Sequence, residues 1–233
     1  MDFSSAGLSA LWAQADTIGR TVGLLLALMS VLVWSLIALK LVQLWQMRRP
    51  ARAAAEAFWR ANDFDAGLAA LGANNPFRSL AEAAHAGSDW QRRQHGALGS
   101  HIPPRDWTER SLAQSIAHAQ STLGGGMAWL AAIASTAPFV GLFGTVWGIQ
   151  HALVAIGTSG QASLDRVAGP VGEALVMTAA GLAVAVPAAL AYNLLVRANR
   201  ETLARLNRFG YDLLAYFDGG ERVGRRGPLP QEA

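Results

Sequence analysis

The sequence predicts an all-α membrane protein with three transmembrane helices and a helical cytoplasmic domain. Two observations lead to this fold class. Of 233 residues, 52% are hydrophobic and only 15% are charged, a larger apolar share than a soluble domain usually carries. The apolar residues gather in three runs, 20–44, 127–156 and 167–196, and each is long enough for the roughly 20-residue helix that crosses a bilayer.

The first run is predicted to be an anchor that stays on the protein. Residues 1–19 contain Asp2 and Asp16 but no Lys or Arg, so they lack the basic start of a cleavable signal peptide. From Thr21 to Leu44 the apolar run that follows contains a single charged residue, Lys40. We therefore expect a first transmembrane helix over 20–44, preceded by an N-terminal segment of 19 residues.

A domain of short helices is predicted over residues 45–126, because breakers and caps divide that segment at close intervals. The expected helices run from Ala51 to Arg60, from a cap at Asn62 or Asp63 to Leu71, from Pro76 to about Gly87, and from Arg105 to Leu123. Three consecutive glycines, 124–126, then precede the second transmembrane helix. They form either a functional hinge or only a relaxed join between two helices.

The second and third transmembrane helices are predicted to form an antiparallel hairpin. Residues 127–156 contain no Asp, Glu, Lys or Arg, and residues 167–196 contain a single acid, Glu173. The polar turn 157–166 is short, so the two helices have to return side by side in opposite directions.

The length of this turn also sets which residues lie at the same depth. Folding the chain after Gln161 brings Thr145 level with Thr178, and Gln150 level with Glu173. One polar layer is therefore expected to contain the only acid of the hairpin.

Small or special residues form a stripe along each helix of the hairpin, because they recur in steps of three and four. The stripes are Ala134, Pro138, Gly141, Thr145, Gly148 and Ala152 on the second helix, and Ala174, Thr178, Gly181, Ala185 and Ala188 on the third. Lipid gives helices no hydrophobic reason to associate, so such stripes, like the pair Gly144 and Gly148, indicate tight helix packing. We expect a ring oligomer, because the stripes and Glu173 would otherwise face lipid.

Basic residues predict the orientation of the chain, since they favour the cytoplasmic side. They follow the first transmembrane helix as Lys40, Arg48, Arg49 and Arg52, and the third as Arg197, Arg200, Arg205 and Arg208. The hairpin turn offers only Arg166, balanced by Asp165. The N-terminus is thus expected outside, with residues 45–126 and a C-terminal helix and tail over 197–233 in the cytoplasm. Because the basic residues gather at membrane ends, we do not expect nucleic acid as a partner.

Two segments resemble the membrane hairpin of the MotA/TolQ/ExbB proton channel family. The first contains Pro-Phe-Val-Gly-Leu-Phe-Gly-Thr-Val-Trp-Gly-Ile from Pro138, and the second contains Gly-Pro-Val-Gly-Glu-Ala-Leu-Val-Met-Thr-Ala-Ala-Gly-Leu-Ala-Val-Ala-Val-Pro-Ala from Gly169. The resemblance is closest to the branch that energises TonB. It implies a multi-pass protein of the bacterial inner membrane with a periplasmic N-terminus.

The resemblance also implies partners and a function. It implies a homopentamer whose second and third helices ring a pore, and that pore holds the transmembrane helices of an ExbD dimer, each with an aspartate. The complex would couple the proton gradient to TonB-dependent uptake across the outer membrane. A TolQ-type subunit of the Tol-Pal envelope system and a non-conducting scaffold for ExbD-like helices are the alternatives.

Glu173, Thr145 and Thr178 are the candidate residues of a proton pathway, and each matches a position of the family motifs. An ionisable group inside a membrane helix costs about 2.5 to 3.5 kcal/mol, so it usually serves a pathway or a partner. The alternatives are that Glu173 simply hydrates near the interface and that the threonine hydroxyls bond back to their own helices. Because five residues separate Glu173 from Thr178, about 140° around a helix, we expect the threonines to face the pore and Glu173 to lie at its flank.

Other residues are candidates for packing or, more weakly, for a relay. Helix packing is expected at Gly141, Gly144, Gly148, Gly181, Pro138 and Pro187. Gln150 and His151 could extend a proton relay, although a single histidine at a helix end is commonly a plain interfacial group. No motif of an enzyme, a metal site or a cofactor site stands in the sequence, so none of these is expected.

Overall fold

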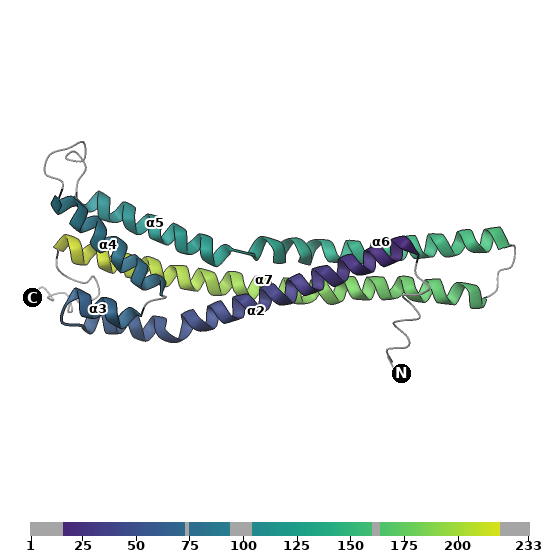
Figure 1. Cartoon of the computed structure of the whole chain (residues 1–233), viewed down its shortest axis with the longest axis horizontal. Coiled ribbons are helices and arrows are strands. Elements are labelled where there is room, and N and C mark those ends of the chain that lie inside the picture. The colour runs from purple at the N-terminus through teal and green to yellow at the C-terminus, as the bar shows by residue number, and fades with distance from the viewer. Residues whose placement is uncertain (1–15, 73–74, 94–103, 160–163, 220–233) are drawn as a thin grey trace, which may run out of the picture. The chain divides into compact units, whose positions relative to one another are not determined.

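The structure is a computed structural model that describes residues 16–72, 75–93, 104–159 and 164–219 (Figure 1). Within these ranges all regular structure is α-helical, which confirms the all-α prediction. The helices are α2 (Thr17–Arg60), α3 (Phe64–Leu71), α4 (Pro76–Arg93), α5 (Pro104–Gly124), α6 (Met127–Ser159) and α7 (Leu164–Gly219). Most of the expected N-terminal segment, the centre of the hairpin turn and the end of the C-terminal tail lie outside the described residues.

The chain divides into two compact units. The membrane unit consists of Met1–Lys40 and Gly126–Leu195, and the aromatic-core unit consists of Leu41–Gly125 and Val196–Ala233. These divisions fall within a few residues of the expected ends of the transmembrane segments at 44, 126 and 196. Among the described residues, three helical stretches are long and apolar enough to span a membrane, namely Thr17–Trp45, Arg105–Val154 and Gly169–Asp218.

Two of the helices are longer than the transmembrane segments expected within them. Helix α2 continues past residue 44 to Arg60, and α7 continues past residue 196 to Gly219. The alanine-rich stretch 51–60 and the Leu-, Arg- and Ala-rich stretch 197–206 both favour helix. The sequence therefore located the apolar segments, whereas local helix propensity carries both helices beyond them.

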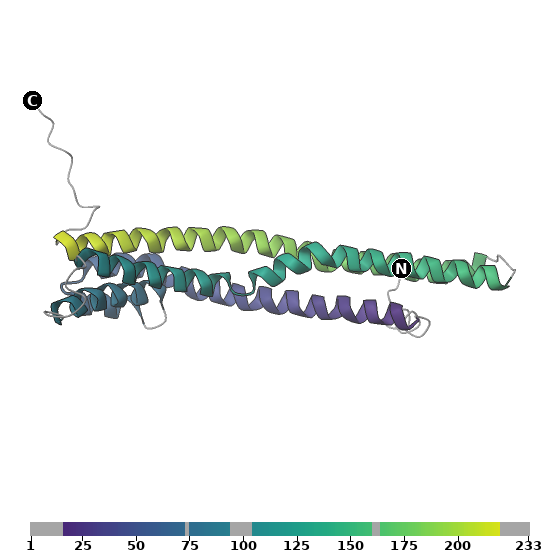
Figure 2. The same ribbon diagram turned by 90° about the horizontal axis from the view of Figure 1, so that it is seen from above.

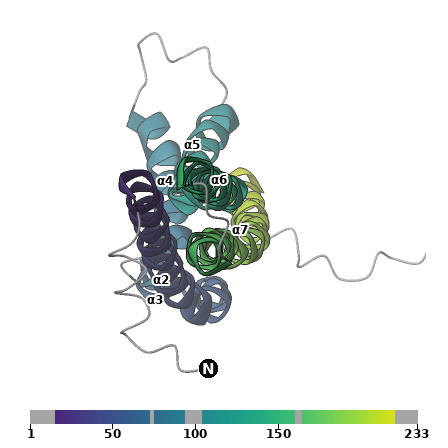
Figure 3. The same cartoon turned by 90° about the vertical axis from the view of Figure 1, so that its right-hand side faces the viewer.

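In the membrane unit, α2 runs beside the hairpin of α6 and α7 (Figures 2 and 3). Its interior is built from small and medium apolar side chains. They are Val22, Leu26 and Val33 from α2, Leu130, Ile133 and Ala137 from α6, and Ala174, Ala185 and Ala188 from α7. Large apolar side chains such as Leu28, Phe139 and Leu190 are exposed on the outside, as expected for helices in contact with lipid.

The glycine run at the start of the membrane unit forms a turn between two helices. Gly126 has φ 78°, in the left-handed region that favours glycine. A Cβ at Gly126 would also lie 2.9 Å from Cδ2 of Leu36. The backbone conformation thus favours glycine at this position, whereas the tip of the Leu36 side chain could move aside.

The aromatic-core unit buries a cluster of large side chains. The buried members are Phe58, Leu71, Phe77, Leu80, Ala81, Ala84, Leu112, Leu206, Phe209 and Leu213. The ring of Phe209 meets the rings of Phe58 and Phe77 edge to face, at centroid distances of 5.4 Å. Such contacts add to the free energy that burial of the aromatic area provides.

Most of the predicted helix boundaries in this unit are observed, but the start at Ala51 and the end near Gly87 are wrong, since α2 runs unbroken through residue 51. Asp63 caps α3 by accepting the N–H of Ala66 at 2.6 Å, and α4 begins at Pro76. However, α4 does not end near Gly87 but continues to Arg93. A Cβ at Gly87 would lie 3.2 Å from Cα of Thr108, so this glycine allows α4 to approach α5 closely instead of ending the helix.

Candidate functional site

Helices α6 and α7 meet backbone to backbone in the middle of the membrane unit. A Cβ on Gly141 would lie 2.6 Å from the carbonyl oxygen of Met177, and one on Gly181 would lie 2.7 Å from that of Ala137. A Cβ on Gly181 would also lie 3.1 Å from Cα of Gly141. Only glycine permits this approach, and we call this contact the glycine seam.

Two further glycines of α6 extend the contact toward the end of the helix. A Cβ on Gly148 would lie 3.2 Å from Cβ of Ala174. One on Gly144 would meet both neighbouring helices, at 3.0 Å from Cβ of Met177 and 3.1 Å from Cγ1 of Val22. These contacts show that α6 and α7 pack side by side along this stretch, as the short turn predicts.

The two stripes of small residues therefore pack on each other within one chain. The sequence argument for a ring oligomer assumed that these stripes would otherwise face lipid, and that assumption is wrong. The reason is physical, since two complementary stripes on consecutive helices satisfy each other first. The ring itself remains an expectation that rests on the family resemblance.

The two candidate threonines lie beside the glycine seam. Thr145 is only 7% exposed, and its hydroxyl donates to the carbonyl oxygen of Leu142 at 2.6 Å. Thr178 is half-buried, and its Cα would lie 3.2 Å from a Cβ on Gly141. The structure thus places both threonines next to the seam, with the Thr145 hydroxyl bonded back to its own helix.

The two candidate prolines lie inside helices, Pro138 in α6 and Pro187 in α7, and both are half-buried. Proline removes one backbone hydrogen bond from a helix, and in a membrane neighbouring groups have to satisfy the carbonyl that is set free.

Glu173 and Gln150 are not brought face to face. Glu173 is half-buried on α7, and Asp16 at the start of α2 is its electrostatic neighbour. Gln150 is exposed, and it lies about 200° around α6 from Gly148, the residue that contacts α7. The expected polar layer therefore includes Glu173 without Gln150.

Asp16 takes the place beside Glu173, and sequence reasoning missed it. One carboxylate oxygen accepts the backbone N–H of Gly19 at 2.6 Å, and the other accepts the indole Nε1–H of Trp147 at 2.7 Å. The signal was an aspartate directly before the first apolar run, which is the usual place of a helix cap.

The environment of Asp16 favours its charged form. Partial burial by itself would raise the pKa of this carboxyl, but the hydrogen bonds from Trp147 and Gly19 and the nearby His151 outweigh it, so the pKa is lowered. His151, the weaker relay candidate, is exposed and belongs to this group. We call Asp16, Trp147, His151 and Glu173 the Asp16 cluster; it joins α2, α6 and α7.

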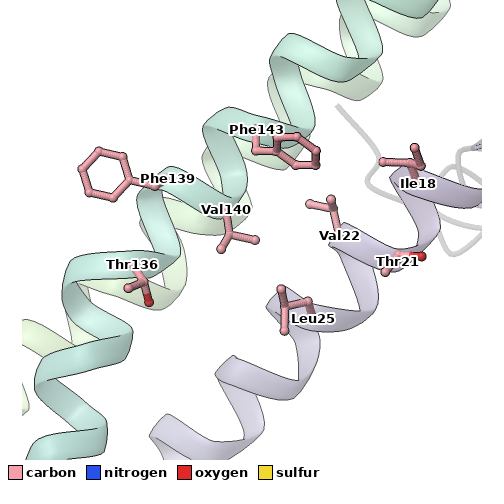
Figure 4. Close-up of a pocket in the computed structure, with 8 residues that line it drawn as sticks. All are labelled: Ile18, Thr21, Val22, Leu25, Thr136, Phe139, Val140 and Phe143. Atoms are coloured by element: carbon pink, nitrogen blue, oxygen red, sulfur yellow. The ribbon is translucent and has the colours of Figure 1, made fainter.

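An apolar crevice of about 470 Å³ separates α2 from α6 (Figure 4). Its lining consists of Ile18, Thr21, Val22, Leu25, Thr136, Phe139, Val140 and Phe143. The hydroxyls of Thr21 and Thr136 donate to Thr17 and Ala132 carbonyl oxygens of their own helices, at 2.8 and 2.7 Å. The crevice therefore offers no free hydroxyl donor and suits an apolar occupant.

No metal site was found in the part of the chain that the structure describes, where no three His, Asp or Glu side chains gather in a way that could hold an ion. The polar side chains of the membrane unit can hold and exchange protons instead, through two carboxylates and an imidazole.

Comparisons with known proteins agree with the sequence resemblance. A model of the MotA/TolQ/ExbB proton channel family matches residues 79–208. The biopolymer transport protein ExbB of Xanthomonas campestris is 39% identical over 201 residues, 84% of this chain and 79% of that protein. The ExbB of Neisseria meningitidis serogroup B is 39% identical over 211 residues, 88% of this chain and 94% of that protein. The Tol-Pal system protein TolQ of Haemophilus influenzae is 54% identical over only 65 residues, 28% of each chain.

Proposed function

The chain belongs to the MotA/TolQ/ExbB proton channel family, and on this premise we propose that it is the proton-channel subunit of an ExbB-type energy-transducing complex. It is a multi-pass membrane protein of a transport and channel family. The relatives that match most of the chain carry the ExbB name, whereas the TolQ relatives match only part of it. An ExbB-type role in biopolymer transport is therefore the function of this chain.

The observation that carries the conducting role is the position of Glu173. It is the only acid of the membrane segment of α7, and it is half-buried and interacts electrostatically with Asp16. An acid at this position raises the free energy of placing the helix in the membrane, and a purely structural helix does not need one. In this proposal Glu173 holds or passes the proton, while Thr145 and Thr178 supply hydroxyls farther along the pathway.

The proposal includes an assembly and an orientation. The N-terminus lies in the periplasm and the aromatic-core unit in the cytoplasm, as the basic residues favour. Five chains surround a pore lined by α6 and α7. One chain with one intramembrane acid cannot relay a proton across the bilayer, so the pore has to hold a partner with a second titratable group. An ExbD-like subunit with a transmembrane aspartate meets this need, and a TonB-like protein receives the work.

The test is TonB-dependent siderophore uptake in a strain that lacks its own ExbB. Glu173→Gln keeps the volume and much of the hydrogen bonding but removes the titratable proton, so we expect normal membrane levels, normal partner pulldown and no uptake. Glu201→Gln is a matched control in the same helix, because Glu201 forms only an exposed pair with Arg197 at 3.5 Å. Normal uptake by Glu173→Gln would overturn the conducting role and leave the scaffold.

A further inference from the structure

The Asp16 carboxylate is fixed at both of its oxygens. The cap bond to Gly19 ties it to α2, and the indole of Trp147 ties it to α6, across 131 positions of sequence. A capping aspartate needs only the first of these bonds. Asp63 shows the simpler case, since it caps α3 through Ala66 at 2.6 Å as a local N-cap.

The second bond determines where the charge of Asp16 lies. This bond fixes the position of the Asp16 carboxylate. The carboxylate interacts electrostatically with two titratable groups, His151 of α6 and Glu173 of α7. Arg20, one turn along α2, donates its backbone N–H to the Asp16 carbonyl at 3.0 Å and has an exposed side chain.

We propose that Asp16 is a positioning residue for the intramembrane acid: Trp147 and the start of α2 hold its carboxylate beside Glu173, so that a fixed negative charge from the first helix governs when Glu173 takes up its proton. A charged neighbour changes the ionisation of a carboxyl group, and the size of this effect depends on the position of the charge, which the indole bond fixes. The first helix thereby acts on the pathway without lining it. This inference rests on the proposed function only in taking Glu173 as the group that carries the proton.

The test measures the protonation of Glu173 directly, independently of transport. The full chain is reconstituted in lipid nanodiscs, and the infrared band of its protonated carboxyl groups is followed against pH. The Glu173 contribution is the part that disappears in Glu173→Gln. We expect Asp16→Asn to shift the midpoint of this contribution by about half a pH unit or more, in the sense that loss of a negative neighbour dictates.

Two further variants separate charge placement from helix capping. Trp147→Phe keeps the Asp16 charge but removes the N–H that holds it, so we expect a smaller shift of the same sign. Asp63→Asn removes the charge of an equivalent helix cap in the aromatic-core unit, and it should leave the midpoint unchanged. Circular dichroism checks that each variant folds, and if Asp16→Asn does not fold, Trp147→Phe alone decides.

An unchanged midpoint in folded Asp16→Asn, or in Trp147→Phe where that variant decides, would overturn the inference. If uptake is still lost in Glu173→Gln, the proposed function stands while the role of Asp16 fails. A parent protein whose Glu173 band does not titrate at all would overturn both the role of Asp16 and the proton-carrying role of Glu173.

Discussion

Substitution of Gly181 by alanine should weaken the membrane unit, because the glycine seam has no room for a methyl group. The new Cβ would lie 2.7 Å from the carbonyl oxygen of Ala137 and 3.1 Å from Cα of Gly141. Both obstacles are backbone atoms of a helix, so they cannot rotate away as a side chain could. The helices have to separate locally, and we expect a loss of about 1 to 3 kcal/mol in the free energy of unfolding.

A matched control lies in the same helix. Gly172 also belongs to the membrane segment of α7, but a Cβ there would have nothing within 4 Å. Gly172→Ala should therefore avoid the clash and gain the better helix propensity of alanine, roughly 0.5 to 1 kcal/mol. The two glycine-to-alanine variants should consequently differ by about 2 kcal/mol or more.

The assay is equilibrium unfolding of the purified chain in mixed micelles, followed by far-ultraviolet circular dichroism. Each variant is compared with the parent at one lipid-to-detergent ratio, so that the micelle contributes equally. If Gly181→Ala proves as stable as Gly172→Ala, the glycine seam can accommodate a methyl group, and our reasoning about it is wrong.

Three further predictions concern single polar or glycine positions. Thr145→Val should keep the fold, since the lost bond runs only to its own helix, yet reduce siderophore uptake, whereas Thr202→Val, which removes a similar bond of 2.9 Å to Ala198 in the aromatic-core unit, should leave uptake normal. Because the pKa of Asp16 is lowered, its stabilisation is complete above the ordinary value of 3.8 and is lost as pH falls through the folded value. The difference in melting temperature between the parent and Asp16→Asn should thus be constant from pH 8 to about 5 and vanish only in stronger acid. Gly126→Ala should cost about 1 kcal/mol or more in unfolding experiments because of its φ of 78°, whereas Gly124→Ala, with nothing within 4 Å, should not.

The sequence predicted the parts of the fold that depend on short-range patterns. Apolar runs identified the membrane segments, and the short turn predicted that α6 and α7 pack side by side. Caps and breakers placed the start of α3 and α4. Each of these features is determined by residues within a few turns of one another, so one stretch of chain contains the whole signal.

The remaining features depend on contacts between distant residues. The bond of Asp16 to Trp147 joins positions 131 residues apart, and the sequence around either residue does not indicate its partner. Glycine is common at helix ends, so the sequence predicts that α4 ends near Gly87. Its close contact with α5 gives another reason for the glycine, and α4 continues to Arg93. The stripes were recognised as packing faces, but their partner within the same chain became clear only from the close approach of Gly141 to Gly181.

The glycine seam also has a consequence for motion. Sliding α6 along α7 by one residue, about 1.5 Å, would bring side chains against the backbone where only hydrogens fit now. The two helices therefore have a single register and have to move as one rigid pair. Helix α2 is held differently, by side chains such as Val22 against Gly144 and by the bond of Asp16 to Trp147. We therefore expect any displacement within the membrane unit to occur between α2 and this pair, and to require exchange of the hydrogen bond between Asp16 and Trp147.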